Sequence, residues 1–379
     1  MNRIYLDHAA TSPTDPKVVE KMMPYFTETF GNPSSIHSFG RESRKWVDEA
    51  RGSIANLIGA SQNEIVFTSG GTEANNLAVI GAALSRKHKG NHIITTEIEH
   101  HAVLHPCERL EEMGFQVTYL KPDQDGKVSA GQVRNALRED TILVTIMYGN
   151  NEVGSVQPIK DIGELVKNHT AYFHTDAVQA FGYLPIQVKS ENIDLMSVSG
   201  HKLNGPKGTG FLYVSQNAKL SPQMLGGEQE RKQRAGTENV PGIVGLNEAV
   251  RLSVEKREAK SQLYREFKTI MIQSLKEKEV NVQINGDVNE SLPHVLNLYF
   301  PGVQVEALLV NLDLEGIAVS SGSACTAGSL LPSHVLKAMY GEDAPQLRSS
   351  VRISFGPEHT KEKIKRASEK LAEVVRRLM

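Results

Sequence analysis

The chain alternates between segments whose apolar residues recur at helical spacing and short, continuous apolar runs. The clearest helical pattern covers Gly40 to Gly59, where Val47, Ala50 and Ile54 recur between charged positions. Apolar runs typical of buried strands occupy residues 64–68, 92–96, 116–120, 142–147, 171–175, 194–198 and 210–214. Further helical patterns separate several of them, at residues 74–84, 102–113, 129–137 and 158–166. This alternation predicts an α/β fold with a mainly parallel sheet covered by helices on both faces.

Beyond Pro241 the pattern changes. A long, charged helical stretch begins at Ile243 and runs through Phe267 toward Lys278. Short strands at 282–284, 295–300 and 351–355 and helices at 305–314 and 360–378 complete the chain. We therefore expect residues 13–255 to form a large α/β domain, and residues 1–12 and 256–379 to form a smaller α+β domain.

A glycine-rich turn follows the strand at residues 64–68. It contains Ser69, Gly70, Gly71 and Thr72, and a helical segment comes directly after it. Backbone N–H groups at such a turn offer a site to a phosphate group. Helix capping by Ser69 or Thr72 is the alternative. Capping leaves the paired glycines unexplained, so the turn favours phosphate binding.

Polar side chains also gather where other predicted strands end: Glu99-His100, Asn150 to Glu152, Asp176 to Gln179, and His201-Lys202. Ligands of open α/β sheets bind at these carboxyl ends. The Lys202 amine can form a Schiff base with an aldehyde cofactor, although a surface lysine in a glycine-rich loop is the alternative. A lysine, a strand-end acid and a phosphate turn together indicate pyridoxal 5′-phosphate.

That cofactor needs a carboxylate facing its ring nitrogen, and Asp176 is the candidate. Capping of a helix is the alternative role for Asp176. His100 can stack on the ring, and Gln179 and Asn151 can donate to its phenolic oxygen.

Cys325 lies in a run of small residues, Ser320 to Ser329, which is typical of a loop. It is either a nucleophile or a spectator thiol, whereas Cys107 lies in the apolar pattern of a helix and is expected to be a small buried side chain.

Composition argues against several classes of protein, among them nucleic-acid-binding and membrane-spanning proteins. The 379 residues are 39% hydrophobic and 23% charged, with a formal net charge of −2. That charge argues against direct nucleic-acid binding, and no apolar run approaches the roughly 20 residues of a membrane span. The first residues, MNRIYLDHAATSP, lack the apolar core of a signal peptide, so we expect a cytoplasmic protein. Two cysteines and thirteen histidines without HExxH or CxxC spacing predict no metal site.

Ten segments of the chain resemble those of the cysteine desulfurases (NifS/IscS-like, class V aminotransferase superfamily). They are YLDHAATSP, GNPSSIH, FTSGGTEANN, EHHAVL, NNEVGSVQPI, HTDAVQ, SGHKLNGPKGTG, RAGTEN, SSGSAC and VRISFG. They run in family order from residue 5 to residue 356. The resemblance implies the type I fold of pyridoxal-phosphate enzymes, which is the aspartate aminotransferase fold, with a large cofactor-binding domain and a small domain carrying the Cys325 loop.

The resemblance also implies roles for individual residues. Lys202 would hold the cofactor covalently, Asp176 would pair with its ring nitrogen, and His100 would stack on the ring and move protons. Arg352 would clamp the substrate carboxylate, with Asn151 beside it. The remaining cofactor contacts would come from Gln179 and Asn151 at the phenolic oxygen and from Gly71, Thr72, Ser199 and His201 at the phosphate. Thr237 resembles the threonine that reaches the phosphate from the other subunit, so a homodimer is implied.

The implied reaction removes sulfur from L-cysteine, giving L-alanine and a persulfide on Cys325. The sulfur would then pass to an acceptor protein, either an iron–sulfur cluster scaffold or an enzyme that thiolates transfer RNA. Three alternatives stay open at this point: an aminotransferase, a selenocysteine lyase, and a non-catalytic adaptor that binds the cofactor. An aminotransferase has no need of a loop cysteine, and an adaptor has no need of Lys202, Asp176, His100, Arg352 and Cys325 together.

Overall fold

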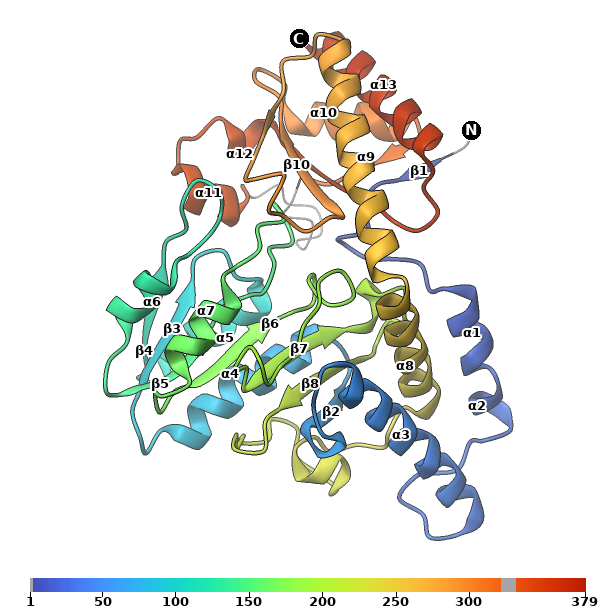
Figure 1. Ribbon diagram of the computed structural model, residues 1–379, viewed down its shortest axis with the longest axis vertical. Helices are drawn as coiled ribbons and strands as arrows, with labels where there is room; N and C mark the ends of the chain where they lie inside the picture. The colour runs from blue at the N-terminus through green and yellow to red at the C-terminus, as the bar shows by residue number, and fades with distance from the viewer. Residues whose placement is uncertain (1–2, 322–331) are drawn as a thin grey trace.

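The computed structural model describes residues 3–321 and 332–379 (Figure 1). A large sheet with its covering helices forms one end of the molecule, here called the large unit. A smaller group of strands and helices forms the other end, the small unit. The strands are β1 (Ile4–Tyr5), β2 (Ile65–Thr68), β3 (His92–Thr96), β4 (Gln116–Leu120), β5 (Thr141–Thr145), β6 (Tyr172–Asp176), β7 (Leu195–Ser199), β8 (Gly210–Val214), β9 (Gln283–Ile284), β10 (Val295–Tyr299), β11 (Ile317–Ala318) and β12 (Ser350–Ser354).

The helices connect and cover these strands. They are α1 (Pro16–Met22), α2 (Pro24–Thr27), α3 (Ser38–Leu57), α4 (Gly71–Arg86), α5 (His101–Glu112), α6 (Ala130–Ala136), α7 (Ile159–Val166), α8 (Val240–Glu255), α9 (Arg257–Glu277), α10 (Val305–Leu314), α11 (His334–Tyr340), α12 (Gln346–Ser349) and α13 (Lys361–Leu378). Pro16, the first residue of α1, and Asp15, whose side chain accepts a hydrogen bond from the Lys17 N–H, illustrate how local sequence starts a helix.

The large sheet has seven strands in the order β2-β8-β7-β6-β5-β3-β4. The strands from β7 to β4 run parallel, whereas β8 is antiparallel to both of its neighbours. Both faces are buried, because Ile65 and Phe67 enter one hydrophobic core while Val66 between them enters another. Helices α4 and α5 pack against the second core, which confirms the predicted α/β fold with a mainly parallel, doubly covered sheet.

The smaller sheet is antiparallel, in the order β12-β10-β9. Helices α9, α10 and α13 cover it through a third core that includes Phe267, Leu298, Ile353 and Leu371. Strand β1 at the start of the chain pairs with β11, so the two ends of the chain lie in the same region (Figure 1). The domain boundaries given above remain a prediction.

The long helix predicted from Ile243 is two helices. Helix α8 ends at Glu255 and α9 begins at Arg257, and Lys256 between them leaves helical geometry, with φ −95° and ψ 4°. Helix α8 packs on the large unit and α9 on the small unit, so both have an apolar face. The helical spacing of apolar residues therefore continues across the break, and the sequence pattern did not reveal it.

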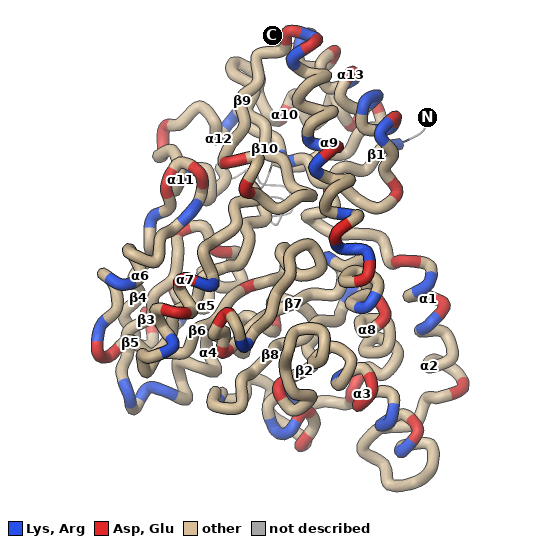
Figure 2. Tube along the Cα trace, in the orientation of Figure 1, with Lys and Arg blue, Asp and Glu red and all other residues tan. Residues whose placement is uncertain are grey.

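Charged residues of both signs are interspersed along the described chain (Figure 2). Many of them pair on exposed helix faces, as Arg251 does with Glu248 and Glu255. None of the described helices is long and apolar enough to cross a lipid bilayer.

Candidate active site

A cavity of about 320 Å³ lies where the predicted strand ends meet the N-terminal segment and β12. Its volume is at the lower end of the range of small-molecule sites, roughly 300–1,000 Å³. The cavity is lined by Ala9, Ala10, Gly71, Thr72, Asn75, His100, Met147, Gly149, Asn151, Asp176, Val178, Gln179, Ser199, His201, Lys202 and Arg352. Nine side chains singled out from the sequence, together with Gly71, therefore converge on one cavity.

Lys202 sits in a single helical turn, Gly200–Lys202, directly after β7. Its amine donates hydrogen bonds to the main-chain carbonyls of Ala9 and Ala10, at 2.5 and 2.6 Å. The amine is therefore held inside the cavity by the first segment of the chain.

Asp176 is the last residue of β6 and is almost completely buried. One carboxylate oxygen accepts a hydrogen bond from the Asn75 amide at 2.6 Å, and the other accepts from the Val178 N–H at 2.9 Å. Burial raises the pKa of this carboxyl, and the hydrogen bonds and the nearby charge of Lys202 only partly oppose the rise. The site is therefore suited to a cationic ligand atom that would keep Asp176 ionised.

The turn predicted to bind phosphate is formed by Gly70, Gly71 and Thr72 at the start of α4. Helix α4 begins at Gly71 after Gly70, and no side chain caps it, so the capping interpretation of Thr72 is wrong. A Cβ atom at Gly71 would lie 2.8 Å from Val178 Cγ2, which explains the glycine beside the cavity. Ser199 and His201, at the end of β7, face the same cavity as Thr72.

His100 precedes α5, and its Nδ1 atom accepts a hydrogen bond from the Ala102 N–H at 3.0 Å. Burial, together with the charges of Lys202 and the neighbouring histidines, lowers the pKa of His100 to about 4. The imidazole is therefore neutral near pH 7, with its proton on Nε2. A neutral ring with one N–H can both stack on a planar ligand and donate a proton.

Arg352, in β12, is 2% exposed and closes the cavity from the small unit. Its guanidinium donates to the Asn151 carbonyl at 3.0 Å and to the Asp7 carboxylate at 2.8 Å. These two contacts fix the plane of the guanidinium, which is the orientation that recognition of a carboxylate requires.

Gln179 lines the cavity with its amide held at both ends. Its Nε2 donates to the Ala9 carbonyl at 2.9 Å, and its Oε1 accepts from His294 Nε2 at 3.1 Å. Since Ala9 also accepts from Lys202, two predicted cofactor residues share one carbonyl.

Two of the residues singled out from the sequence, Thr237 and Cys107, lie away from this cavity. Thr237 lines a separate cavity of about 220 Å³, which also includes Ser69, Gly208 and Arg234. Cys325 lies outside the described residues. Cys107 is fully buried in α5, and burial holds its thiol pKa far above the ordinary value, so it is an unreactive core side chain as expected.

Several cavity residues were missed from the sequence. Asn75 is a polar residue on the apolar face of α4, between Ala74 and Leu77, and that misplaced amide was the available signal. Ala9 and Ala10 act through main-chain carbonyls, which no side-chain pattern reveals. Asp7 and His294 meet the site only through tertiary contacts.

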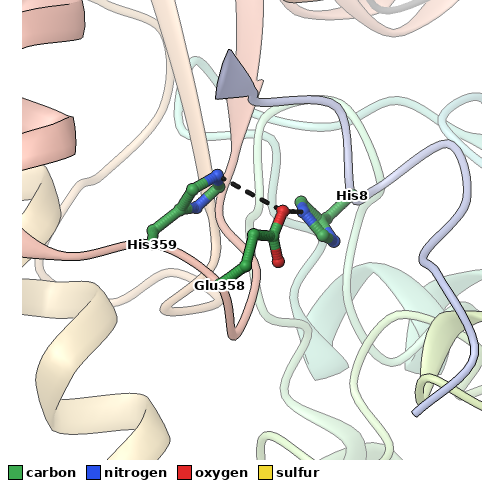
Figure 3. A group of neighbouring side chains, drawn as sticks. All are labelled: His8, Glu358 and His359. Atoms are coloured by element: carbon green, nitrogen blue, oxygen red, sulfur yellow. Dashed lines mark hydrogen bonds and ion pairs between the residues drawn. The ribbon is translucent and has the colours of Figure 1, made fainter. Parts of the chain in front are cut away.

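One group of potential metal ligands is found among the described residues: His8, Glu358 and His359 (Figure 3). His359 Nδ1 accepts from the Gly356 N–H at 3.0 Å, and Nε2 donates to the Tyr5 carbonyl at 2.9 Å. Both ring nitrogens of His359 are thus engaged, and no lone pair remains for a metal. The 2.7 Å contact between His8 and Glu358 ties the N-terminal segment to the chain before α13.

Comparisons with known proteins identify the family of the chain. The aminotransferase class-V family model matches residues 4–367. The putative cysteine desulfurase IscS 1 of Bacillus subtilis is 69% identical over 378 residues, which cover 100% of both chains, and the cysteine desulfurase IscS of Methanosarcina thermophila is 48% identical, covering 99% of this chain and 92% of that one. A solved NifS-like protein superposes with a TM-score of 0.93 at 35% identity, covering 99% and 100% of the two chains. The chain belongs to the cysteine desulfurase family, within the class-V aminotransferases.

Proposed function

We propose that this protein is a pyridoxal-phosphate-dependent cysteine desulfurase that converts L-cysteine to L-alanine and holds the sulfur as a persulfide on Cys325. The observation that carries the proposal is the convergence of Lys202, Asp176 and Arg352 on one cavity, from three distant parts of a chain of this family. An amine, a buried acid and a carboxylate-binding guanidinium are the groups that chemistry on an amino acid requires.

The donor set fits pyridoxal phosphate. The buried Asp176 carboxylate lacks a cationic partner strong enough to offset burial, and a protonated ring nitrogen would provide one. Thr72, Ser199, His201 and the Gly71 backbone would hold the phosphate, and Gln179 and Asn151 would face the phenolic oxygen. When bound, the cofactor supplies an electron sink for the negative charge that develops at the substrate α-carbon.

Lys202 and His100 would move the protons. Lys202 would hold the cofactor covalently, and its amine would take the α-proton of cysteine. Ala9 and Ala10 keep that amine in the cavity through their carbonyls. Neutral His100 carries its proton on Nε2 and would deliver it to, or accept it from, the substrate sulfur side.

Arg352 would bind the α-carboxylate of cysteine, with its plane fixed by Asp7 and Asn151. One of the solved relatives, SspA, 41% identical with a TM-score of 0.82, is described in complex with cysteine. Cysteine has one α-carboxylate, and Arg352 offers one guanidinium in this cavity to bind it.

The described residues on either side of the segment that carries Cys325 contact residues of this cavity or their neighbours. Ser320 pairs with Arg352 through main-chain hydrogen bonds of 2.6 and 3.1 Å, and His334 donates to the Glu99 carbonyl next to His100. We infer that Cys325 can reach the substrate, since five residues of extended chain from Ser320 span up to about 17 Å. Its thiolate would attack the sulfur of cysteine, whose bond to carbon breaks, and the net change is Cys–SH plus cysteine to Cys–S–SH plus alanine.

We further infer a homodimer and a protein acceptor for the sulfur. Thr237 lies off the main cavity, in accordance with a residue that serves a second subunit. Large apolar side chains are exposed along residues 19–39, among them Phe26, Phe30 and Phe39, and exposed apolar surface of this kind supports a protein contact there. The acceptor would be an iron–sulfur cluster scaffold or a tRNA-thiolating enzyme, and two cysteines in 379 residues accord with a reducing cytoplasm.

The test measures alanine and sulfide released from L-cysteine with dithiothreitol, for wild type, Cys325→Ala and Lys202→Ala. We expect turnover in wild type only, with the visible absorbance of the bound cofactor kept in Cys325→Ala and lost in Lys202→Ala. Turnover by Cys325→Ala at the wild-type rate would contradict the persulfide assignment. Preference for selenocysteine over cysteine would indicate a lyase instead.

A further inference from the structure

His294 contacts the candidate active site without lining its cavity. It immediately precedes β10 in the small unit, is 2% exposed, and lies against Gln179 from the large unit. Its Nε2 atom is 3.1 Å from Gln179 Oε1. The sequence predicted no role for this residue, and its contact with Gln179 is its link to the site.

The hydrogen bonds fix the orientation of both side chains. The Ala9 carbonyl can only accept, so the Gln179 atom 2.9 Å from it is the amide nitrogen. The other end of Gln179 is then an oxygen, and His294 Nε2 must be the donor. Burial lowers the pKa of His294 well below the ordinary value, and Lys260 and Lys268 lower it further, so the ring is neutral with a single N–H.

Stacking fixes the direction of that N–H. The His294 ring lies on the Tyr183 ring at a centroid distance of 3.8 Å and an interplanar angle of 13°. Tyr183 is itself buried, and the Lys260 amine lies 4.1 Å from its ring centroid. The imidazole therefore cannot tilt away from Gln179 without separating two stacked rings.

We propose that His294 is a positioning residue that holds the Gln179 amide in the flip state that presents an N–H to the phenolic oxygen of the cofactor. The Gln179 nitrogen has two hydrogens. One is used by Ala9, and the second is available to the cavity that Gln179 lines. Without the His294 donor, the Gln179 oxygen loses this partner and the Ala9 carbonyl alone orients the amide, so the second N–H is held less firmly toward the phenolic oxygen.

This inference rests on the proposed function, because it concerns the cofactor of that site. It links the small unit to the electronic state of the cofactor, since a donor to the phenolate stabilises the anion and lowers its pKa. The effect is expected in the spectrum of the bound cofactor as well as in turnover.

The experiment compares three replacements loaded with pyridoxal phosphate. His294→Phe keeps a ring on Tyr183 and removes the donor, His294→Gln keeps an N–H within reach of Gln179, and His294→Asn is too short to reach it. We expect His294→Phe and His294→Asn to shift the visible absorbance maximum, to raise the pH midpoint of its titration, and to lower kcat about three- to tenfold. His294→Gln should return all three toward wild type. If His294→Phe does not fold, His294→Asn provides the same comparison.

Two controls separate positioning from general damage. His92 is also buried, bonded to Thr118 and Thr141 far from Gln179, and His92→Phe should leave the cofactor spectrum unchanged. In a Gln179→Leu background, His294→Phe should add no further spectral shift, because the two residues act as one unit.

The results that overturn the inference are distinct from failure of the proposed function. Wild-type spectrum and titration in His294→Phe, or equal shifts in His294→Phe and His294→Gln, would refute the positioning role while wild type still desulfurates cysteine. A wild-type protein that does not take up pyridoxal phosphate would overturn both.

Discussion

The Asn75 amide donates to the Asp176 carboxylate at 2.6 Å, and both side chains are buried beside the cavity. Because hydrogen bonds to charged groups are worth about 1.5–3 kcal/mol, Asn75 is a principal reason that the acid can stay ionised. The pair joins α4, which starts at the phosphate turn, to the end of β6.

Replacing Asn75 by Leu should therefore weaken the enzyme through Asp176. Its loss removes a hydrogen bond from a carboxylate whose pKa burial already raises. We expect kcat to fall tenfold or more, and the affinity for pyridoxal phosphate to fall with it, as measured by cofactor titration. Asn76→Ala, one position along the same helix and outside the cavity, should change neither by more than about twofold. Equal losses in the two variants would contradict this role.

Arg352→Lys should damage substrate binding more than cofactor binding. A lysine has a single ammonium and cannot contact Asn151, Asp7 and a substrate carboxylate in one plane. We expect KM for cysteine to rise roughly 10- to 100-fold, while the visible absorbance of the bound cofactor stays at its wild-type position. An unchanged KM would place the carboxylate elsewhere.

His174 should make the fold sensitive to acid. It is fully buried between Thr145 and Ser197, and burial lowers its pKa to about 3, from 6.5. Below pH 6.5 the unfolded chain binds a proton that the folded chain does not, so stability falls as pH falls from about 6.5 toward 3. At pH 5 the loss is about 2 kcal/mol.

Urea unfolding at pH 7 and pH 5 checks this expectation. His174→Asn should be less stable than wild type at pH 7, but its further loss on going to pH 5 should be smaller by about 2 kcal/mol. His88→Asn, which replaces an exposed histidine, provides the matched control. A pH dependence in His174→Asn equal to that of wild type would refute the assignment.

The buried ion pair of Arg51 and Glu230 should be worth far more than exposed pairs. Each side chain is 3% exposed, and two hydrogen bonds of 2.7 Å join them. Glu230→Gln leaves the Arg51 charge uncompensated, so we expect a loss of about 3–5 kcal/mol in the free energy of unfolding. Glu112→Gln breaks an exposed pair with Arg109 and should cost less than about 1 kcal/mol. Chemical denaturation compares the two, and similar losses would contradict the expectation.

Patterns along the chain predicted the parts of the fold that depend on local sequence. Alternating apolar runs gave the large sheet because its strands are buried on both faces, and the strand ends brought Lys202, Asp176 and His100 to one edge. The break at Lys256 was not predicted, because the helical spacing of apolar residues continues through it. Only the surface against which the helix packs changes, from the large unit to the small unit.

The rest of the site depends on contacts between distant segments. Asp7 meets Arg352 across 345 residues of sequence, and His294 meets Gln179 across 115. Such pairs leave no periodic signal in one chain, because each residue is ordinary among its own neighbours. Asn75 was different, since an amide on an apolar helix face is locally out of place.

Because Ala9 and Ala10 act through their carbonyls, the start of the chain should tolerate substitution at these two positions. They hold the Lys202 amine through main-chain atoms, so replacing either alanine by another small residue keeps the contact. Adding or removing one residue between Asp7 and Ser12 does not, because Asp7 is anchored to Arg352 and the Ser12 hydroxyl to the His201 carbonyl. Natural variation in this stretch should therefore change residue identities and leave its length constant.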